Sequence, residues 1–317
     1  MQADSAQQPG RGGTSAPRFA IIFKTHAWDE FVARQFERFR RAAGSGDVFI
    51  VADETSGPLG PIPHDRVIRT TNDDLVAHGL ANAFTRGGLV WWNTDYPNYL
   101  AYQQAPDYDY YLFVEYDTRI NLDLDTFIGA VARRGADLVA LPIKQPMDTW
   151  YWGKFHEAYY PRAKMRASLN CISVLSNRAM RLLHDRRREM TIEHSAGKVP
   201  FWPGNEVFLA SEVAAAGFTF VPIDEFGDAS GFEWHPPHLD EDIAEGDPRA
   251  FLHPVLDRRR YIGSVLKFEF DLSSYFVASS PLRRTLARFP AREYVSQLPG
   301  AFRRQITAKV RQALGAI

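Results

Sequence analysis

"YDYYLFVEYDTRIN" (residues 108–121) is a run of apolar and aromatic residues that ends in ionisable side chains. A nearly continuous apolar run of this length is typical of a parallel strand that is buried on both faces. Glu115 and Asp117 stand where this strand would end, and their spacing directs both side chains to the same side. In open parallel sheets, ligands bind beyond the carboxyl ends of the strands. The stretch therefore predicts a buried strand that carries two carboxylates to a binding edge.

The sequence around this strand alternates between strand-like and helical patterns. After the first apolar run, Val32, Phe36 and Phe39 recur at helical spacing, with Asp29 as the expected N-cap and Gly44 as the end of the helix. This alternation is typical of an α/β domain with a mostly parallel, Rossmann-like central sheet and flanking helices. We expect one such domain over residues 18–280. Further strands are expected at residues 47–57, 65–70, 136–143 and from 169, and further helices at 75–84, 96–103 and 124–135.

The composition narrows the class of protein. The chain has 317 residues, of which 45% are hydrophobic, and this is enough to bury a full core. A net charge of −1 gives no electrostatic reason to expect a nucleic-acid partner. Cys171 is the only cysteine, so we expect no internal disulfide, a cytoplasmic location and a core role for its small side chain. Residues 1–17 are expected to be a flexible tail rather than a signal peptide.

The carboxyl end, residues 281–317, is expected to be a basic helical extension. It contains eight basic residues and one acidic residue, with apolar residues at helical spacing between them. One interpretation is a peripheral contact with an anionic surface at the inner face of the membrane. The other is a terminal helix that packs its apolar face on the domain. The apolar positions are Leu282, Leu286, Phe289, Phe302, Ile306, Val310 and Leu314.

Polar residues follow three of the expected strands and should meet at one edge of the sheet. Two carboxylates that converge without a basic neighbour repel each other, and hard oxygen ligands of this kind suit Mg²⁺ or Mn²⁺. Alternatively, Asp117 caps the following turn and Glu115 pairs with Arg119. The residues that follow the first, second and fourth strands are Lys24, Thr25, His26, Asp53, Glu54, Glu115 and Asp117.

Two of these segments resemble the GT-A-fold glycosyltransferases, of the bacterial, family 2-like kind. "VFIVADETSG" (residues 48–57) is similar to the family's second strand, whose acidic turn holds the nucleotide base. "YYLFVEYD" (residues 110–117) is similar to the fourth strand, whose acid-x-acid motif binds the metal and the sugar-nucleotide diphosphate. Because Glu115 stands where the family commonly has Asp, Asp117 is the firmer expected ligand. The resemblance implies a nucleotide-diphosphate sugar as donor.

A third segment, "PGNEVFLASEVAAAGFTFVP" (residues 203–222), resembles the family's Gly-Glu-Asp segment, whose final acid opens a helix. In this register Glu206 takes the place of that acid, which is the catalytic base in inverting members. The resemblance therefore implies that Glu206 is the base and that transfer inverts the sugar. The alternative is that Glu206 only stabilises the helix through its dipole, which would lower the pKa of the carboxyl.

Histidine and aromatic residues complete the expected site. The family often uses a late histidine as a third metal ligand, and His253 is the first choice, with His235 and His238 as alternatives. Aromatic rings in polar surroundings suit stacking on sugar faces, although core packing is the competing role. These rings belong to Trp91, Trp92, Trp150, Tyr151 and Trp152.

The expected function is metal-dependent transfer of a sugar from a nucleotide sugar to a hydroxyl of a glycan or lipid-linked acceptor. A sugar-phosphate nucleotidyltransferase would need a glycine-rich loop after the first strand, and "KTHAWDE" (residues 24–30) contains no glycine. A non-catalytic saccharide-binding or degenerate GT-A protein would keep the fold and lose the metal. Metal-dependent nucleotide binding separates that alternative from the enzyme.

Overall fold

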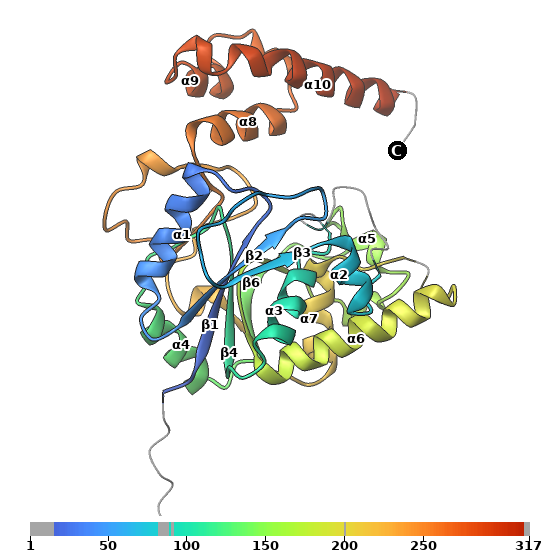
Figure 1. The fold of residues 1–317 in the computed structure, drawn as a ribbon. Coiled ribbons are helices and arrows are strands. Elements are labelled where there is room, and N and C mark those ends of the chain that lie inside the picture. Colours follow the sequence, from blue (N-terminus) through green and yellow to red (C-terminus); the bar gives the residue numbers. More distant parts are fainter. Residues whose placement is uncertain (1–15, 82–88, 90–91, 200, 314–317) are drawn as a thin grey trace, which may run out of the picture.

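The computed structural model describes residues 16–81, 89, 92–199 and 201–313, and its centre is a seven-stranded sheet (Figure 1). The strand order is β3-β2-β1-β4-β7-β6-β8, and all neighbours are parallel except the two pairs that involve β7. The expected mostly parallel sheet with flanking helices is confirmed. The strands are β1 (Phe19–Thr25), β2 (Asp47–Asp53), β3 (Val67–Thr70), β4 (Tyr110–Glu115), β6 (Leu138–Pro142), β7 (Ser168–Ser176) and β8 (Phe220–Pro222).

The direction of β7 is the main departure from a parallel arrangement. β7 runs antiparallel between β4 and β6, with Tyr111 opposite Leu175 and Val114 opposite Ile172. The amino end of β7 therefore lies beside the carboxyl end of β4. As a result Cys171, which we expected in the core, is only partly buried and lies at the edge where the parallel strands finish.

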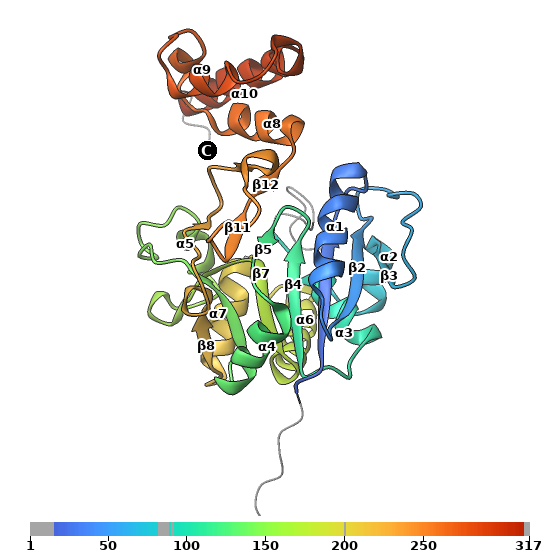
Figure 2. The ribbon, with the colours of Figure 1, turned by 90° about the vertical axis from the view of Figure 1, so that its left-hand side faces the viewer.

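Two hydrophobic clusters cover the two faces of the sheet. Helices α1 (Glu30–Ala42) and α4 (Leu124–Arg133) pack on one face, and α3 (Tyr96–Gln104), α6 (Asn177–Ser195) and α7 (Asn205–Ala215) pack on the other (Figure 2). The expected cap of α1 is confirmed, because the Asp29 carboxylate accepts the backbone N–H of Val32 at 3.1 Å. Gly44 follows α1 with a φ of 56°, a left-handed conformation that favours glycine.

The segment between β3 and α3 is only partly described. Helix α2 (Asn72–Ala77) begins at the capping box of Thr71 and Asp74, earlier than the expected start at residue 75. The helix expected over residues 75–84 is wrong beyond Ala77, because α2 ends there and Gly79 turns the chain with a φ of 70°. Residues 82–84 and Trp91 lie outside the described residues. Helix α3 agrees with the helix expected at residues 96–103.

Short strands after β8 lead the chain back to the carboxyl end of β4. β11 (Phe251–His253) pairs with β5 (Arg119–Ile120) and β9 (Gly231–Phe232), while β10 (His238–Leu239) pairs with β12 (Val255–Leu256). The pairing of Leu252 with Arg119 holds β11 against the turn that follows Asp117. These strands therefore bring His253 to the acidic edge.

Three helices, α8 (Arg258–Phe268), α9 (Pro281–Leu286) and α10 (Leu298–Ala313), form a separate layer above the end of the sheet where β1 and β4 finish (Figures 1 and 2). They share a third hydrophobic cluster, which includes Leu266, Leu282 and Leu286. The expected apolar face of residues 281–289 thus packs against protein. Ile306 and Val310 are instead 54% and 50% exposed, and Leu314 lies outside the described residues. No described helix combines the length and the apolar character needed to cross a membrane.

Candidate functional site

The carboxylate of Glu115 at the end of β4 has a basic neighbour, contrary to the expectation. Lys24 Nζ, at the end of β1, lies 3.4 Å from Glu115 Oε1 and donates a hydrogen bond to the Thr94 carbonyl at 3.2 Å. The alternative pairing of Glu115 with Arg119 is wrong, because Arg119 Nε donates to Asn121 Oδ1 at 3.0 Å. The adjacent parallel strands β1 and β4 thus bring Lys24 and Glu115 together, although 90 residues of sequence separate them.

Asp117, at the same edge, has a carboxylate oxygen that lacks a hydrogen-bond partner among the described residues. This oxygen, Oδ1, is buried, and the nearest described basic side chain is that of His253, whose Nε2 lies 3.8 Å away. Burial raises the pKa of Asp117, the neighbouring His253 lowers it, and the charge of Glu115 raises it. The backbone carbonyl of Asp117 accepts the N–H of Val255 at 2.6 Å. Buried carboxylate oxygens without a donor are the kind of atom that a cation satisfies.

The imidazole of His253 is fixed so that one nitrogen remains free for a ligand. Its Nδ1 lies 2.7 Å from the Glu233 carbonyl, which can only accept, so Nδ1 carries the proton. The lone pair on Nε2 therefore points toward Asp117 and Glu115. A carbonyl that holds the second nitrogen in this way is typical of metal-ligating histidines. His235 and His238 lie outside this arrangement, and His238 Nε2 contacts the Gly231 carbonyl at 2.9 Å.

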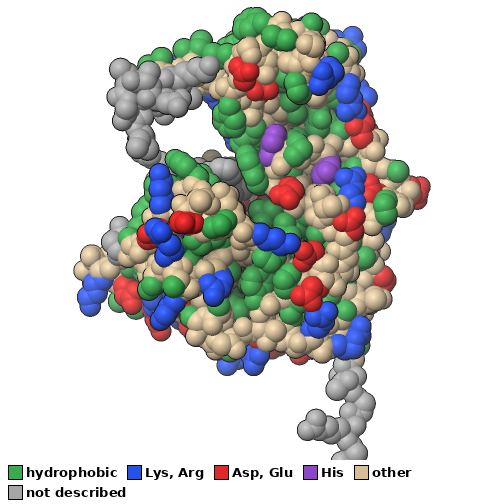
Figure 3. Space-filling view, turned by 180° about the vertical axis from the view of Figure 1, so that it is seen from behind, with side chains coloured by type: hydrophobic (Ala, Val, Ile, Leu, Met, Phe, Trp, Pro, Cys, Tyr) green, Lys and Arg blue, Asp and Glu red, His purple; other side chains and the backbone are tan. Residues whose placement is uncertain are grey.

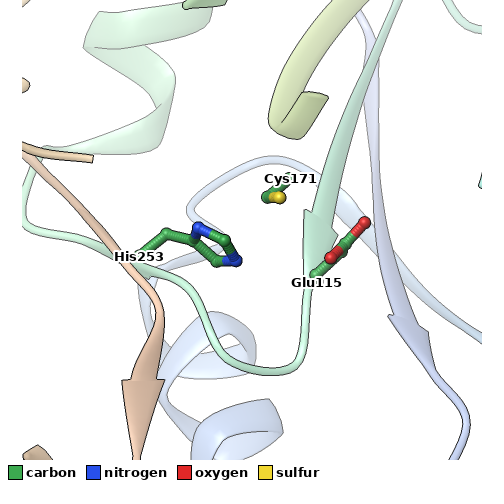
Figure 4. Close-up of side chains that lie close together, drawn as sticks. All are labelled: Glu115, Cys171 and His253. Atoms are coloured by element: carbon green, nitrogen blue, oxygen red, sulfur yellow. The ribbon is translucent and has the colours of Figure 1, made fainter. Parts of the chain in front are cut away.

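Glu115, Cys171 and His253 each offer a donor atom, and the three atoms lie within 4.8 Å of one another. Figure 4 shows the three side chains close together, and they come from β4, β7 and β11. Together with the unpartnered Asp117 oxygen, this donor set fits a divalent cation. The sequence analysis did not identify Cys171 as a site residue. Its only signal there was a polar neighbour, Asn170, in a strand whose other residues are apolar or serine.

Glu206 lies in the first turn of α7 and has a strongly perturbed carboxyl group. Burial, with a further contribution from the charge of Glu115, raises its pKa to about 7. A pure helix-dipole role would lower this pKa instead. The preceding residue, Asn205, donates from Nδ2 to Thr94 Oγ1 at 2.5 Å, and the Thr94 carbonyl accepts from Lys24. Thr94 therefore ties the start of α7 to the end of β1.

The start of α7 is capped by a distant side chain. Its N-cap residue, Gly204, has no side chain to use, and the Gly204 N–H donates to His156 Nε2 at 3.1 Å. His156 ends the short helix α5 (Gly153–His156), and its Nδ1 contacts the Trp152 carbonyl at 2.8 Å. Burial lowers the pKa of His156 to about 4, so the ring is neutral and Nε2 can accept.

The predicted aromatic residues divide into two groups. Trp92 and Trp150 stack on the two sides of His156, with ring centroids 5.5 and 6.4 Å away, so both belong to the packing under α7. Tyr151 and Trp152 are 55% and 36% exposed. Only this second pair has free ring surface of the kind that could contact a ligand.

A buried ion pair lies beneath the same region. Arg187 of α6 and Asp95 are both fully buried, with Arg187 Nε 2.7 Å from Asp95 Oδ2. Arg187 also donates to the Pro203 carbonyl at 3.0 Å, and its guanidinium lies 3.7 Å from the centre of the Phe208 ring. The pair joins the segment that contains Thr94 to the segment that precedes Glu206. Nothing in the sequence analysis singled it out.

The remaining predicted residues lie at the ends of β1 and β2 and have local partners. Thr25 Oγ1 donates to the Ala27 carbonyl at 2.5 Å, and the exposed His26 packs edge-on against Tyr116 at 5.1 Å. The Asp53 carboxylate accepts the Thr55 N–H at 3.0 Å and the Thr55 hydroxyl at 2.6 Å. These residues therefore occupy the expected edge without touching Glu115 or Asp117.

Two hollows adjoin this edge, and neither contains Glu115, Asp117 or Glu206. The larger, about 550 Å³, lies at the start of α1 and includes Arg260, whose guanidinium also lies 5.8 Å from the Tyr116 ring. The smaller, about 400 Å³, includes Lys144 and Glu233. Figure 3 shows histidine and acidic side chains together at the centre of one face, beneath the C-terminal part.

No family model and no curated protein sequence matches the chain. Among solved structures, it is similar to a glycosyltransferase involved in the glycosylation of the major capsid of PBCV-1, with a TM-score of 0.39 and 11% identity over 77% of this chain and 98% of that one. It is also similar to mouse xyloside xylosyltransferase 1, with a TM-score of 0.40 and 14% identity over 75% and 97%. A third is the galactosyltransferase LgtC, with a TM-score of 0.40 and 10% identity over 74% and 86%.

Proposed function

We propose that the chain is a glycosyltransferase that moves a sugar from a nucleotide-diphosphate sugar to an acceptor hydroxyl. The observation that carries the proposal is the convergence of two kinds of group at one edge of the sheet. One is a set of metal-type donors, Glu115, Asp117 and His253, and the other is a carboxyl group, Glu206, with a pKa of about 7. The charge of Glu115 contributes to the raised pKa of Glu206, after burial, and this coupling supports a shared site.

The roles follow from the chemistry of each group. A divalent cation, Mn²⁺ or Mg²⁺ in the sequence prediction, would neutralise the charge that develops on the leaving diphosphate. Asp117, Glu115 and His253 would hold it. A carboxylate with a pKa near the working pH is an effective general base, so Glu206 would take the proton of the acceptor hydroxyl. Attack from the side opposite the diphosphate inverts the configuration of the transferred sugar.

The remaining predicted residues suit the donor. Lys24 adds a buried positive charge beside Glu115, and it would also attract diphosphate oxygens. Asp53 at the end of β2 would contact the nucleotide base, with Thr25 and His26 between the base and the metal. The exposed rings of Tyr151 and Trp152, on the segment that caps α7 through His156, suit stacking on an acceptor sugar.

Calorimetric titration of UDP and of GDP, each with Mn²⁺ and with a chelator, tests this function. We expect one nucleotide to bind in the presence of Mn²⁺ and to bind at least tenfold more weakly to Asp117→Ala. Asp107→Ala is the matched control, because Asp107 is exposed and precedes the opposite end of β4. If neither nucleotide binds to the wild type under any condition, the saccharide-binding alternative replaces the enzyme. If a sugar phosphate and a nucleoside triphosphate react instead, the protein is a nucleotidyltransferase.

We also propose that the C-terminal layer contacts an anionic membrane surface, which would place a lipid-linked acceptor near the site. Phe276 is 74% exposed and stacks on Phe302 of α10, and Ile306 and Val310 continue an exposed apolar stripe on that helix. Arg303 and Arg304 are exposed between them and have no ion-pair partner in the described part of the chain. Apolar side chains bordered by free arginines complement an anionic lipid surface.

Co-sedimentation with vesicles tests this contact. Wild-type protein should sediment with phosphatidylserine-containing vesicles and not with phosphatidylcholine vesicles, and binding should weaken as salt increases. Arg303→Gln/Arg304→Gln and Phe276→Ser/Ile306→Ser should each reduce binding severalfold. Ile192→Ser is the control, because Ile192 is 72% exposed on the distant helix α6. Equal sedimentation of wild type and both double variants would contradict the proposal.

A further inference from the structure

We propose that the Cys171 thiolate is a metal ligand, so that the cation at this edge is held by sulfur, nitrogen and oxygen rather than by oxygen and nitrogen alone. The inference rests on the metal part of the proposed function and changes the class of ion that the site prefers. It follows from the position of Cys171 in the fold, the orientation of its neighbours and the charge that surrounds it.

The antiparallel course of β7 gives Cys171 its position. Val114 pairs with Ile172, so Cys171 comes level with Glu115 where β4 ends. Its sulfur lies within 4.8 Å of a Glu115 oxygen and of a His253 nitrogen, and Figure 4 shows these side chains close together. A parallel β7 would have placed this residue elsewhere along the sheet. The cluster therefore joins three segments that are distant in sequence.

The neighbours of Cys171 provide independent indications of a ligand. His253 is 7% exposed, and the Glu233 carbonyl fixes its ring so that Nε2 presents a lone pair to the cluster. Nε2 lies 3.8 Å from Asp117 Oδ1, which is too far for a hydrogen bond. Asp117 Oδ1 is itself buried and finds no hydrogen-bond partner among the described residues. Two buried polar groups that face one gap without bonding to each other indicate that a third species belongs between them.

The charge at this edge also favours a cation. Burial raises the pKa of the Cys171 thiol most, the charges of Glu115, Asp117 and Glu206 raise it further, and the charge of Lys24 lowers it. A divalent cation held by Cys171 together with Glu115, Asp117 and His253 would offset this excess of negative charge.

The proposed donor set selects among ions. Mg²⁺ prefers six oxygen ligands, whereas thiolate and imidazole favour Zn²⁺ and Co²⁺. We therefore expect the isolated protein to bind Zn²⁺ and Co²⁺ at least tenfold more tightly than Mg²⁺. The sequence analysis expected Mn²⁺ or Mg²⁺ because most of the ligands would be oxygen atoms. That preference would apply only if Cys171 were not a ligand.

Titration of Co²⁺ into chelator-treated protein tests the inference without an activity assay. Cobalt bound by a thiolate gives a sulfur-to-metal charge-transfer band in the near ultraviolet, and Cys171 is the only cysteine in the chain. We expect this band in wild type, its loss in Cys171→Ser, and at least a tenfold weaker affinity of that variant for Zn²⁺ with little change for Mg²⁺. His238→Gln is the control, because His238 lies outside the cluster.

The possible outcomes separate this inference from the proposed function. Binding of Co²⁺ to folded wild-type protein without the charge-transfer band would overturn the role of Cys171 and leave the metal site in place. The wild-type spectrum gives this answer even if Cys171→Ser fails to fold. If none of Co²⁺, Zn²⁺, Mn²⁺ and Mg²⁺ binds, the protein has no metal site at this edge. The proposal that the donor is a nucleotide-diphosphate sugar would still stand if UDP or GDP bound in the presence of chelator.

Discussion

His156 Nε2 accepts the backbone N–H of Gly204 at 3.1 Å, so a side chain of α5 caps the helix that carries Glu206. The first backbone N–H groups of a helix have no partner within the helix, and a glycine N-cap offers no side chain to satisfy them. Trp92 and Trp150 stack on the His156 ring and hold this cap in place. The segment that contains Trp150 and His156 is therefore packed firmly against the start of α7.

His156→Ala should destabilise the protein because it removes both the cap and the ring between two tryptophans. Loss of a cap alone costs about 1 kcal/mol, and truncation of a buried aromatic ring adds to this, so we expect at least about 2 kcal/mol. Urea denaturation measures the change. His194→Ala, which alters an exposed histidine, should cost much less. Equal effects of the two substitutions would contradict the capping role.

The same histidine predicts how stability depends on pH. Its pKa is about 4 in the folded protein and 6.5 in the unfolded chain, so the unfolded chain takes up the proton first. The contribution of neutral His156 to the free energy of unfolding is complete above pH 6.5. It decreases by up to about 3 kcal/mol as pH falls toward 4. Denaturation curves at pH 7.5, 5.5 and 4.5 should show the decrease. In His156→Gln the decrease should be smaller, and an unchanged pH dependence would contradict the prediction.

Glu206→Gln should be less active and more stable than wild type. Loss of a general base should lower the transfer rate by roughly 10²–10⁴-fold. The pKa of Glu206 is about 7 in the folded protein, above its ordinary value of 4.5. The contribution of this carboxyl group to the stability of the folded protein is therefore largest below pH 4.5 and is lost as pH rises through 7. At pH 8 the variant should therefore gain up to about 3 kcal/mol of stability. Glu189→Gln, on an exposed face of α6, should change neither quantity.

The activity of the wild type should fall as pH decreases below about 7. A general base works only when it is ionised, and the raised pKa of Glu206 keeps it protonated at lower pH. The measurement is kcat/KM for sugar transfer between pH 5.5 and 8.5 with saturating metal. Activity that stays constant down to pH 5.5 would show that the essential base is a carboxylate with an ordinary pKa and not Glu206.

Arg187→Met should strongly destabilise the protein. It leaves the buried Asp95 without its ionic partner, and breaking such a pair typically costs about 3–5 kcal/mol. Chemical denaturation gives the free-energy change, and Arg188→Met, at the next and exposed position, is the matched control. Adding Asp95→Asn to Arg187→Met should recover part of the loss. Additive losses from the two substitutions would show that the pair is not coupled.

The strands of the sheet and many of the residues at their carboxyl ends could be predicted from the sequence. Continuous apolar runs mark β1, β2 and β4, and Asp29 and Gly44 delimit α1 because caps are local properties. The direction of β7 is not local. An apolar run is compatible with parallel or antiparallel neighbours, and only the course of the intervening chain decides which one forms.

The missed site features depend on contacts across the fold. Lys24 pairs with Glu115 because β1 lies beside β4, and Cys171 reaches the site because β7 is reversed. His156 and Arg187 act on the start of α7 from other elements, through a backbone N–H and a backbone carbonyl. Such partners leave no spacing pattern in a single sequence. The placement of Glu115, Asp117, Glu206 and His253 near this edge could be predicted because each stands beside a strand end, a helix start or a characteristic motif, while their roles stay predictions.

The position of β7 also affects how the chain folds during synthesis. β4 pairs with β1 on one side, but its other partner is β7, which lies farther along the chain than β6. Until residues 168–176 leave the ribosome, β4 is an open edge of the nascent sheet, with a row of unpaired backbone groups beside the apolar side chains of Leu112, Phe113 and Val114. Open apolar edges of this kind are sites of aggregation. Chains that stop before Ser168 should therefore be recovered mainly as insoluble protein.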